Sequence, residues 1–421
     1  MVDPTTARRI TDAVDAAFER QLDFTAELIR HPSLRAAEAS AQDLMAAEFA
    51  ARGFEVDRWT LDEETLSTHE GYGPTTVAFE DLTNVVGTYT APAGKGRSLI
   101  LNGHIDVVPT GPEETWRHSP WDAVTEDGWL YGRGSGDMKA GLVANLFAFD
   151  ALRAAGLTPT GDICFQSVVE EECTGNGSLA ALQRGYTADA VVIPEPEENM
   201  LVRANVGVIW FRVRVAGKPT HVREMSSGFN AIDAAYRVMA ELRELEAEWN
   251  SHRGEHRYFE DLEHPINLNI GMISGGDWPF SVPAWCEFDA RIALYPGVSA
   301  DAAWQEIERR LRSTSSGADV SAERTGFFAE GYVLEEGSEA EAALADAHGE
   351  VFGSALQSFT TPGYLDGRVF ALYGGVPALV YGPVSRNIHG FDECVEIESV
   401  RRVTKTIALF IAQWCGVEED S

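Results

Sequence analysis

The sequence predicts an α/β protein with a mainly parallel sheet and an inserted α+β unit, and three observations support this fold class. Short apolar runs at 98–102, 162–169 and 190–193 have the length of buried strands. A helical pattern at 141–149 lies between the first two runs, and strands that alternate with helices favour a parallel sheet. Near residue 205 the continuous apolar runs give way to alternating apolar and polar residues.

The other elements follow in order along the chain. Apolar residues recur at helical spacing near the N-terminus, for example at Ile10, Val14 and Phe18. In the inserted unit, a strand with one solvated face precedes a long helix, and a second strand and a second helix follow. The predicted helices cover 5–31, 39–52, 229–248, 300–314 and 397–415, the further strands cover 208–215, 284–294 and 377–381, and 60–84 is expected to be an extended loop.

Composition narrows the class of protein. With 421 residues, 44% of them hydrophobic and 24% charged, the chain is expected to form two or three globular domains. It has no apolar run near the ~18 residues of a membrane span, and its first residues lack the pattern of a signal peptide. Five widely spaced cysteines without a CxxC pair suggest reduced thiols. We therefore expect a cytoplasmic protein that does not enter a membrane.

The charge argues against a nucleic-acid partner. The chain has 66 acidic and 33 basic side chains, for a net charge of −33. Binding to phosphate backbones needs a basic face, and the sequence offers none. Acidic clusters at 62–64, 335–336 and 418–420 are expected to be solvated surface. A nucleic-acid partner is therefore not expected.

Two segments near predicted strand and helix ends carry possible metal ligands. His104 and Asp106 follow the first buried strand, at the kind of strand end where ligands bind in open α/β sheets. A neutral histidine ligates metals and a nearby acid fixes its tautomer, although a lone histidine there is more often structural. The glycine-dense segment 132–141 contains Asp137. Such a turn could cradle phosphate instead, but it lacks the GxxxxGK[ST] order, so a metal-ligating aspartate explains it better.

Further carboxylates follow the other buried strands. Glu170, Glu171 and Glu172 end the second strand, and three adjacent carboxylates repel one another unless a cation or a shared proton intervenes. Glu195 and His389 each lie just beyond a further apolar run. Each is more often structural when taken alone. Together the segments suit a two-cation site, with zinc favoured and manganese or cobalt as alternatives.

The ordered series HIDVVP, GRGSGDMKAG, VVEEE, PEP, GKPTHV and NIHGFDECV resembles the M20 metallopeptidase family. The resemblance runs from about residue 80 to the end of the chain. It implies a zinc-peptidase-like catalytic domain over 1–206 and 323–421, with a ferredoxin-like lid and dimerisation domain over 207–322. It also implies a homodimer.

The resemblance assigns a role to each residue of the site. Two divalent cations would be bound, one by His104 and Glu195 and the other by Glu172 and His389, with Asp137 bridging them. Zinc is the expected metal, with cobalt or manganese as alternatives.

The resemblance also assigns residues beyond the metal ligands. Asp106 would orient His104, and Glu171 would be the general base, which leaves Glu170 without a role. His221 would stabilise an oxyanion in the active site of a partner subunit. Arg291 and Arg368 would bind a carboxylate of the substrate, with surface arginine as the alternative reading.

The expected activity is hydrolysis of an N-acyl amino acid or a related small amide, as in a deacetylase or deacylase. A dipeptidase or carboxypeptidase of the same family is the alternative, and a non-catalytic metal- or ligand-binding homologue is a third reading. Asn205-Val206-Gly207 replaces the arginine pair found before the lid in desuccinylases. The acyl group is therefore expected to be smaller or less charged than succinyl.

Overall fold

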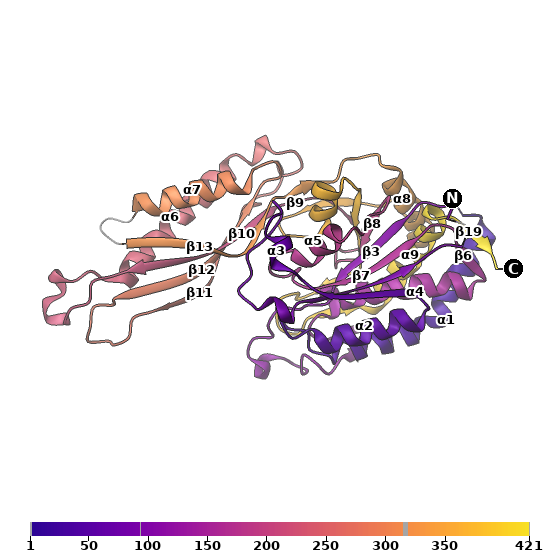
Figure 1. The fold of residues 1–421 in the computed structure, drawn as a ribbon, viewed down its shortest axis with the longest axis horizontal. Coiled ribbons are helices and arrows are strands. Elements are labelled where there is room, and N and C mark those ends of the chain that lie inside the picture. Colours follow the sequence, from indigo (N-terminus) through magenta and orange to yellow (C-terminus); the bar gives the residue numbers. More distant parts are fainter. Residues whose placement is uncertain (1, 93, 315–318, 421) are drawn as a thin grey trace.

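A six-stranded sheet forms the centre of the larger part of the protein, in the order β1-β2-β7-β3-β8-β16 (Figure 1). The computed structural model describes residues 2–92, 94–314 and 319–420. Strands β7, β3, β8 and β16 are parallel; at one edge β2 pairs antiparallel with β7, and β1 pairs antiparallel with β2. The strands are β1 (Glu55–Thr60), β2 (Thr83–Tyr89), β3 (Leu99–His104), β7 (Ile163–Val168), β8 (Val191–Ile193) and β16 (Ala378–Val380). The α/β class predicted from sequence is confirmed.

Both faces of this sheet are buried, which explains the continuous apolar runs. Leu99 and Leu101 of β3 pack into the main core with α1, α4 and α9, whereas Ile100 belongs to a smaller cluster with Phe370. This alternation follows from the two-residue period of a strand. The helices around the sheet are α1 (Pro4–Ile29), α2 (Ala39–Ala51), α4 (Ala140–Ala154), α5 (Asn176–Gln183), α8 (Glu339–Phe352) and α9 (Ile397–Trp414).

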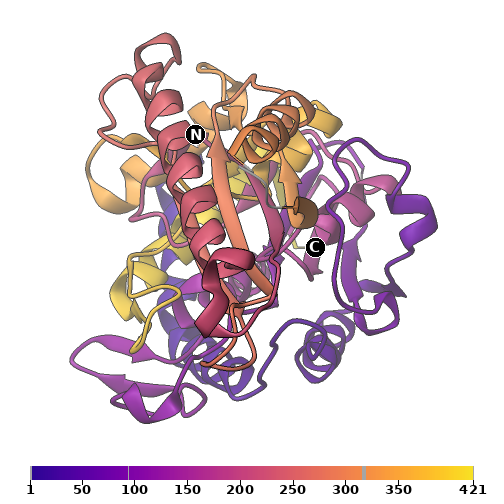
Figure 2. The ribbon, with the colours of Figure 1, turned by 90° about the vertical axis from the view of Figure 1, so that its left-hand side faces the viewer.

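A separate antiparallel sheet projects away from the larger part, and Figure 2 views it end-on. Its strand order is β11-β12-β10-β13, and along the chain its elements follow the pattern βαββαβ. This is the ferredoxin-like arrangement that was expected. We call these six elements the lid: β10 (Gly207–Ala216), α6 (Ala231–Ser251), β11 (Leu268–Gly275), β12 (Trp285–Leu294), α7 (Ala300–Thr314) and β13 (Asp319–Ala329).

The lid strands have one apolar and one polar face. Phe211, Val213 and Val215 of β10 are buried in the lid core, while Arg212 alternates with them and faces the other way. Its guanidinium pairs with Asp289 across the sheet, at 2.7 Å from Nε to Oδ1. The half-buried strand predicted at 208–215 is confirmed. The exact borders between catalytic and lid domains stay a prediction.

Short strands complete the fold. One small sheet joins a hairpin from near the C-terminus to the segment that precedes Asp137, in the order β17-β18-β5-β4. The short strands are β4 (Val124–Glu126), β5 (Trp129–Tyr131), β6 (Leu157–Pro159), β9 (Leu201–Asn205), β14 (Tyr332–Val333), β15 (Ser358–Thr361), β17 (Ser385–Arg386), β18 (Cys394–Glu396) and β19 (Val417–Glu419). The extended loop predicted at 60–84 is observed between the end of β1 and the start of β2, and it is irregular apart from the short helix α3 (Glu63–Leu66) and one 3₁₀ turn, Phe79–Asp81.

No helix in the described part of the chain has the length and apolar character needed to cross a bilayer. The five cysteines are all buried, and all are free thiols.

Candidate metal centre

The predicted metal ligands meet at one edge of the central sheet. His104 is the last residue of β3, Glu172 follows β7, and Glu195 follows β8. These three neighbouring strands are parallel, so their carboxyl ends lie at the same edge, where α/β sheets bind ligands. Asp137 arrives from the turn before α4, and His389 arrives from the hairpin between β17 and β18.

Asp137 lies between the two histidines. One of its oxygens, Oδ1, is 3.0 Å from Nε2 of His104, and the other, Oδ2, is 3.3 Å from Nε2 of His389. His389 Nε2 also lies 3.0 Å from Oε2 of Glu172, and His104 Nε2 lies 3.7 Å from Oε1 of Glu195. The five side chains thus form two histidine–glutamate pairs that share one aspartate, which is the arrangement that the sequence resemblance implies.

The electrostatics of this cluster fit bound cations. Glu172 and Asp137 raise the pKa of His389 to about 11, even though burial opposes the shift. Burial also opposes protonation of His104, but Glu195 and Asp137 outweigh it and raise the pKa of His104 well above its usual value. In the metal-free protein, protons on the two imidazoles therefore offset the negative charge of the carboxylates. In the metal-bound protein, divalent cations would offset this charge instead.

One buried carboxylate oxygen also supports a cation-binding site. Oε1 of Glu195 has no hydrogen-bond partner among the described residues, and burial raises the pKa of this carboxyl to about 7. A buried carboxylate oxygen without a donor is destabilising unless something neutralises it. Ligand atoms of His104, Asp137 and Glu172 lie within 4.8 Å of one another, close enough to share an ion. Histidine and carboxylate donors suit zinc, cobalt or manganese.

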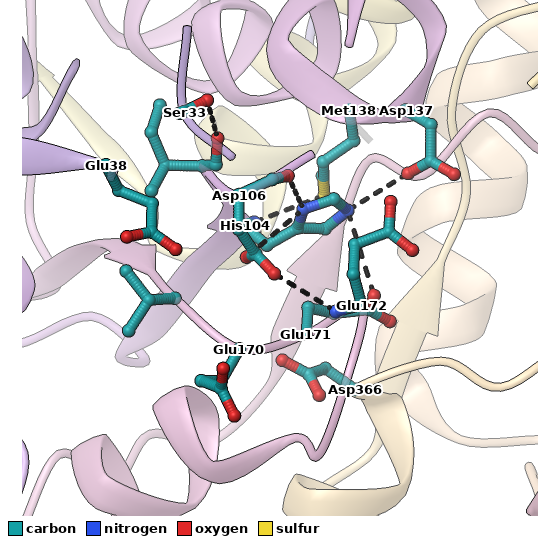
Figure 3. A network of polar contacts seen from close by, with 12 residues as sticks. Ser33, Glu38, His104, Asp106, Asp137, Met138, Glu170, Glu171, Glu172 and Asp366 are labelled. Atoms are coloured by element: carbon teal, nitrogen blue, oxygen red, sulfur yellow. Dashed lines mark hydrogen bonds and ion pairs between the residues drawn. The ribbon is translucent and has the colours of Figure 1, made fainter. Parts of the chain in front are cut away.

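Asp106 contacts two of the candidate metal-ligand residues, one through its backbone carbonyl and the other through its carboxylate. Its backbone carbonyl lies 2.8 Å from Nδ1 of His104, closer than its carboxylate, which is 3.6 Å away (Figure 3). A proton on Nδ1 directed at this carbonyl leaves Nε2 free to face Asp137 and a metal. The Asp106 carboxylate instead accepts a hydrogen bond from the backbone amide of Glu172, at 3.2 Å. Burial raises the pKa of Asp106 to about 7.

The three consecutive glutamates point in different directions. Glu170 has a φ of 66° and turns its fully buried carboxylate away from the cluster, where Arg35 Nη2 and Thr174 Oγ1 donate to it at 2.8 and 2.9 Å. Glu171 lies beside the metal ligands, with Oε2 3.9 Å from His104 Nε2. Burial raises the pKa of Glu171 well above its usual value. The left-handed turn at Glu170 separates carboxylates that would otherwise repel one another.

A cavity of about 500 Å³ opens beside the cluster, between the metal ligands and the lid. Arg291 of β12 is one of the side chains that line it, and burial lowers the pKa of its guanidinium to about 10. No carboxylate among the described residues forms an ion pair with it. Sequence reasoning did not identify several lining residues, because only the packing of the lid against the sheet edge brings them together: Val208, Trp210, Asn269, Phe327 and Tyr364.

Two predicted residues lie outside this cavity. Arg368 is 1% exposed, and it donates from Nε to the backbone carbonyl of Glu330 at 3.0 Å and from Nη2 to the hydroxyl of Tyr373 at 2.7 Å. His221 is exposed beyond the far end of β10, where its Nδ1 accepts from the amide of Arg223. The six residues that follow Trp210 in β10 extend the strand by ~20 Å, so His221 does not reach the cavity of its own chain.

Known proteins similar in sequence to this chain are hydrolases, as the candidate site suggests. A model of the peptidase family M20/M25/M40 matches residues 100–413. The N-formyl-4-amino-5-aminomethyl-2-methylpyrimidine deformylase of Halalkalibacterium halodurans is 30% identical over 348 residues, which cover 77% of this chain and 80% of that protein. The succinyl-diaminopimelate desuccinylase of Stenotrophomonas maltophilia is 30% identical over 394 residues, which cover 90% of this chain and 95% of that protein.

Solved structures with the same fold include human carnosine dipeptidase 1, with a TM-score of 0.76 and 16% identity over 97% of this chain and 99% of that one. A di-peptidase of Saccharomyces cerevisiae has a TM-score of 0.77 and 15% identity over 97% and 98% of the two chains. At this identity the likeness concerns the fold alone. The matched family model and the two relatives establish the family itself: the chain is a metal-dependent amidohydrolase or peptidase of the M20/M25/M40 family.

Proposed function

We propose that the protein hydrolyses the amide bond of an N-acyl amino acid or a related small amide, with two divalent cations as cofactor. The observation that carries this proposal is the position of Glu171 beside the two histidine–glutamate pairs, in a cavity that also contains Arg291. The relatives at 30% identity are named for the removal of formyl and succinyl groups from nitrogen, which supports a deacylase.

The chain's own residues divide the work. Divalent cations at His104, Glu195, Asp137, Glu172 and His389 would polarise the amide carbonyl and make water more acidic. Glu171 is the group placed to take a proton from the attacking water and to deliver it to the departing amine. Arg291, at the lid side of the cavity, would bind an acidic group of the substrate and so orient the amide relative to Glu171.

The test is a panel of N-formyl, N-acetyl and N-succinyl amino acids together with dipeptides. Each is assayed with metal-free protein reconstituted with zinc, cobalt or manganese. Preference for acyl amino acids supports a deacylase, and preference for dipeptides supports the alternative, a dipeptidase or carboxypeptidase. A protein that binds metal but turns over none of these would be the non-catalytic homologue. Glu171→Gln serves as the inactive control.

We further propose that the protein is a homodimer in which His221 serves the partner's site. The lid carries large exposed apolar side chains near His221: Trp278 is 65% exposed and Phe280 is 61% exposed. The backbone of Val222 bonds that of Phe280, so His221 lies beside this apolar surface. Exposed apolar patches of this kind favour association with another protein surface.

The five free thiols also suit a reducing compartment, which supports the expected cytoplasmic location.

Subunit exchange tests the role of His221. His221→Ala and Glu171→Gln should each be nearly inactive as pure proteins, since loss of one oxyanion donor costs ~10²–10³-fold. After mixing and exchange, a heterodimer holds one site with both groups intact, and recovery should approach about a quarter of wild-type activity. Light scattering verifies the dimer. If exchange occurs and no activity returns, His221 has no role in the partner's site.

A further inference from the structure

The glycine-rich segment before Asp137 wraps around a buried carboxylate from a distant part of the chain. Oε1 of Glu393 accepts hydrogen bonds from the backbone amides of Gly136 and Asp137, each at 3.0 Å. Oε2 of Glu393 accepts from the backbone amide of Gly134 at 3.0 Å and from Nη1 of Arg133 at 2.6 Å. Glu393 and Arg133 are each 1% exposed. Four donors therefore converge on one carboxylate that solvent does not reach.

The glycines allow the backbone amides to converge in this way. Gly134 has a φ of +79°, and a Cβ atom there would lie 2.6 Å from Cγ1 of Val107. A Cβ atom at Gly136 would lie 2.8 Å from Cβ of Ser385. Successive amides that point to one side form a concave anion-binding nest. The phosphate cradle considered from the sequence is thus a nest, and the anion in it is the protein's own Glu393.

Arg133 extends the contact to the other ligand-bearing segments. Its Nη2 donates to the backbone carbonyl of Pro109 at 3.2 Å, in the segment that follows His104. It also donates to the backbone carbonyl of Gly390 at 3.0 Å, directly after His389. The ion pair of Arg133 and Glu393 therefore joins the three segments that carry His104, Asp137 and His389.

The small sheet explains why these distant residues meet. Strands β5 and β18 pair antiparallel, with Tyr131 opposite Cys394. The next residue after Tyr131 and the one before Cys394 are then opposite each other, and the amide of Gly132 donates to the backbone carbonyl of Glu393 at 3.0 Å. The side chain of Glu393 therefore enters the turn that begins at Gly132 and leads to Asp137.

We propose that Glu393 and Arg133 are positioning residues that hold the Asp137 carboxylate between His104 and His389, so that metal affinity depends on an ion pair that binds no metal itself. The inference rests on the metal centre proposed above. Asp137 is the side chain shared by both histidine–glutamate pairs, so a shift of its backbone would disturb both pairs at once. Loss of an outer partner of this kind typically lowers metal affinity or activity by ~10–100-fold.

The experiment replaces Glu393 with glutamine. The amide nitrogen of glutamine is a donor, so it cannot accept from Arg133 or from the nest amides as a carboxylate oxygen does. The matched control is Glu341→Gln, which removes the carboxylate partner of Arg203, another largely buried arginine, away from the cavity. Metal-free wild type, Glu393→Gln and Glu341→Gln are titrated with zinc, and kcat and KM are measured at saturating metal. Thermal unfolding of the metal-free proteins records the purely structural cost of each change.

Glu393→Gln should bind zinc ~10–100-fold more weakly. At saturating metal its kcat should fall with KM little changed, while Glu341→Gln keeps wild-type zinc affinity even if its unfolding temperature drops. Equal zinc affinity in wild type and Glu393→Gln would overturn the inference and leave the metal centre standing. Wild type that binds no zinc would overturn both. If Glu393→Gln does not fold, Arg133→Lys decides the matter: it keeps the charge but loses the fork to Pro109 and Gly390, and unchanged zinc affinity there overturns the inference.

Discussion

Replacing Arg291 with glutamine should weaken turnover of substrates that carry a free carboxylate and spare those that lack one. Arg291 lies directly opposite Trp210 on β10 and Asn269 on β11, and residues opposite each other on antiparallel strands point to the same face. All three side chains line the cavity beside the metal ligands. With a pKa lowered to about 10 by burial, the guanidinium is still a cation at neutral pH. A substrate carboxylate would be its counter-ion.

The size of the effect follows from the lost contact. A hydrogen bond to a charged group contributes about 1.5–3 kcal/mol net, which corresponds to a ~10–150-fold loss in kcat/KM. A substrate whose carboxylate is replaced by a neutral amide makes no ion pair with Arg291, so it should lose only a small factor. Arg212 is the matched control, because it lies on the same sheet and is already paired with Asp289, at 2.7 and 2.8 Å.

The assay compares an N-acyl amino acid with its C-terminal amide. Values of kcat/KM are measured for wild type, Arg291→Gln and Arg212→Gln at saturating metal. We expect the ratio of acid to amide turnover to fall ~10–150-fold in Arg291→Gln and to stay within about twofold of wild type in Arg212→Gln. Equal losses for acid and amide in Arg291→Gln would refute the assignment, and so would a matching change of ratio in Arg212→Gln.

Two further predictions concern the metal centre itself. Glu171→Gln should lower kcat by ~10²–10⁴-fold and keep its metal, whereas Glu172→Gln should lose metal. Metal analysis and kinetics of both variants test this prediction. If the two phenotypes were exchanged, the roles of the two glutamates would be reversed. Metal binding at neutral pH should release protons, since neighbouring carboxylates raise the pKa of His389 to about 11 and raise the pKa of His104 well above its usual value, and both imidazoles must lose those protons to become ligands. Zinc affinity should therefore increase as pH rises from 6 to 8; calorimetry in buffers of different ionisation enthalpy measures the release, and binding without it would contradict the pKa shifts.

The central strands and the candidate ligands at their ends were predictable from sequence. Strands β3, β7 and β8 are buried on both faces, so each contains a run of consecutive apolar residues, and the charged or ionisable residues at the ends of these strands stand out. His104, Glu172 and Glu195 are in that position. Which of three adjacent glutamates faces the cavity could not be derived from strand geometry, because the left-handed turn at Glu170 interrupts the alternation.

Contacts between distant segments were beyond sequence reasoning. The strands β5 and β18 are only three residues long and carry no periodic pattern, yet their pairing brings Glu393 to the turn that holds Asp137. The sequence also does not show whether an arginine is enclosed by protein groups or lines a cavity. Arg291 and Arg368 were predicted as one kind of residue, but Arg368 is enclosed by protein groups and Arg291 lines the cavity. Only packing separates a buried structural cation from one that is available to a ligand.

The central claim is that catalysis depends on cations held by His104, Asp137, Glu172, Glu195 and His389. The most direct test is to strip the protein with a chelator, then measure turnover of an N-acyl amino acid as zinc is added back in known amounts. The account predicts no turnover without metal, and full recovery as bound zinc approaches two ions per chain. Full turnover in protein shown by elemental analysis to contain no metal would contradict it.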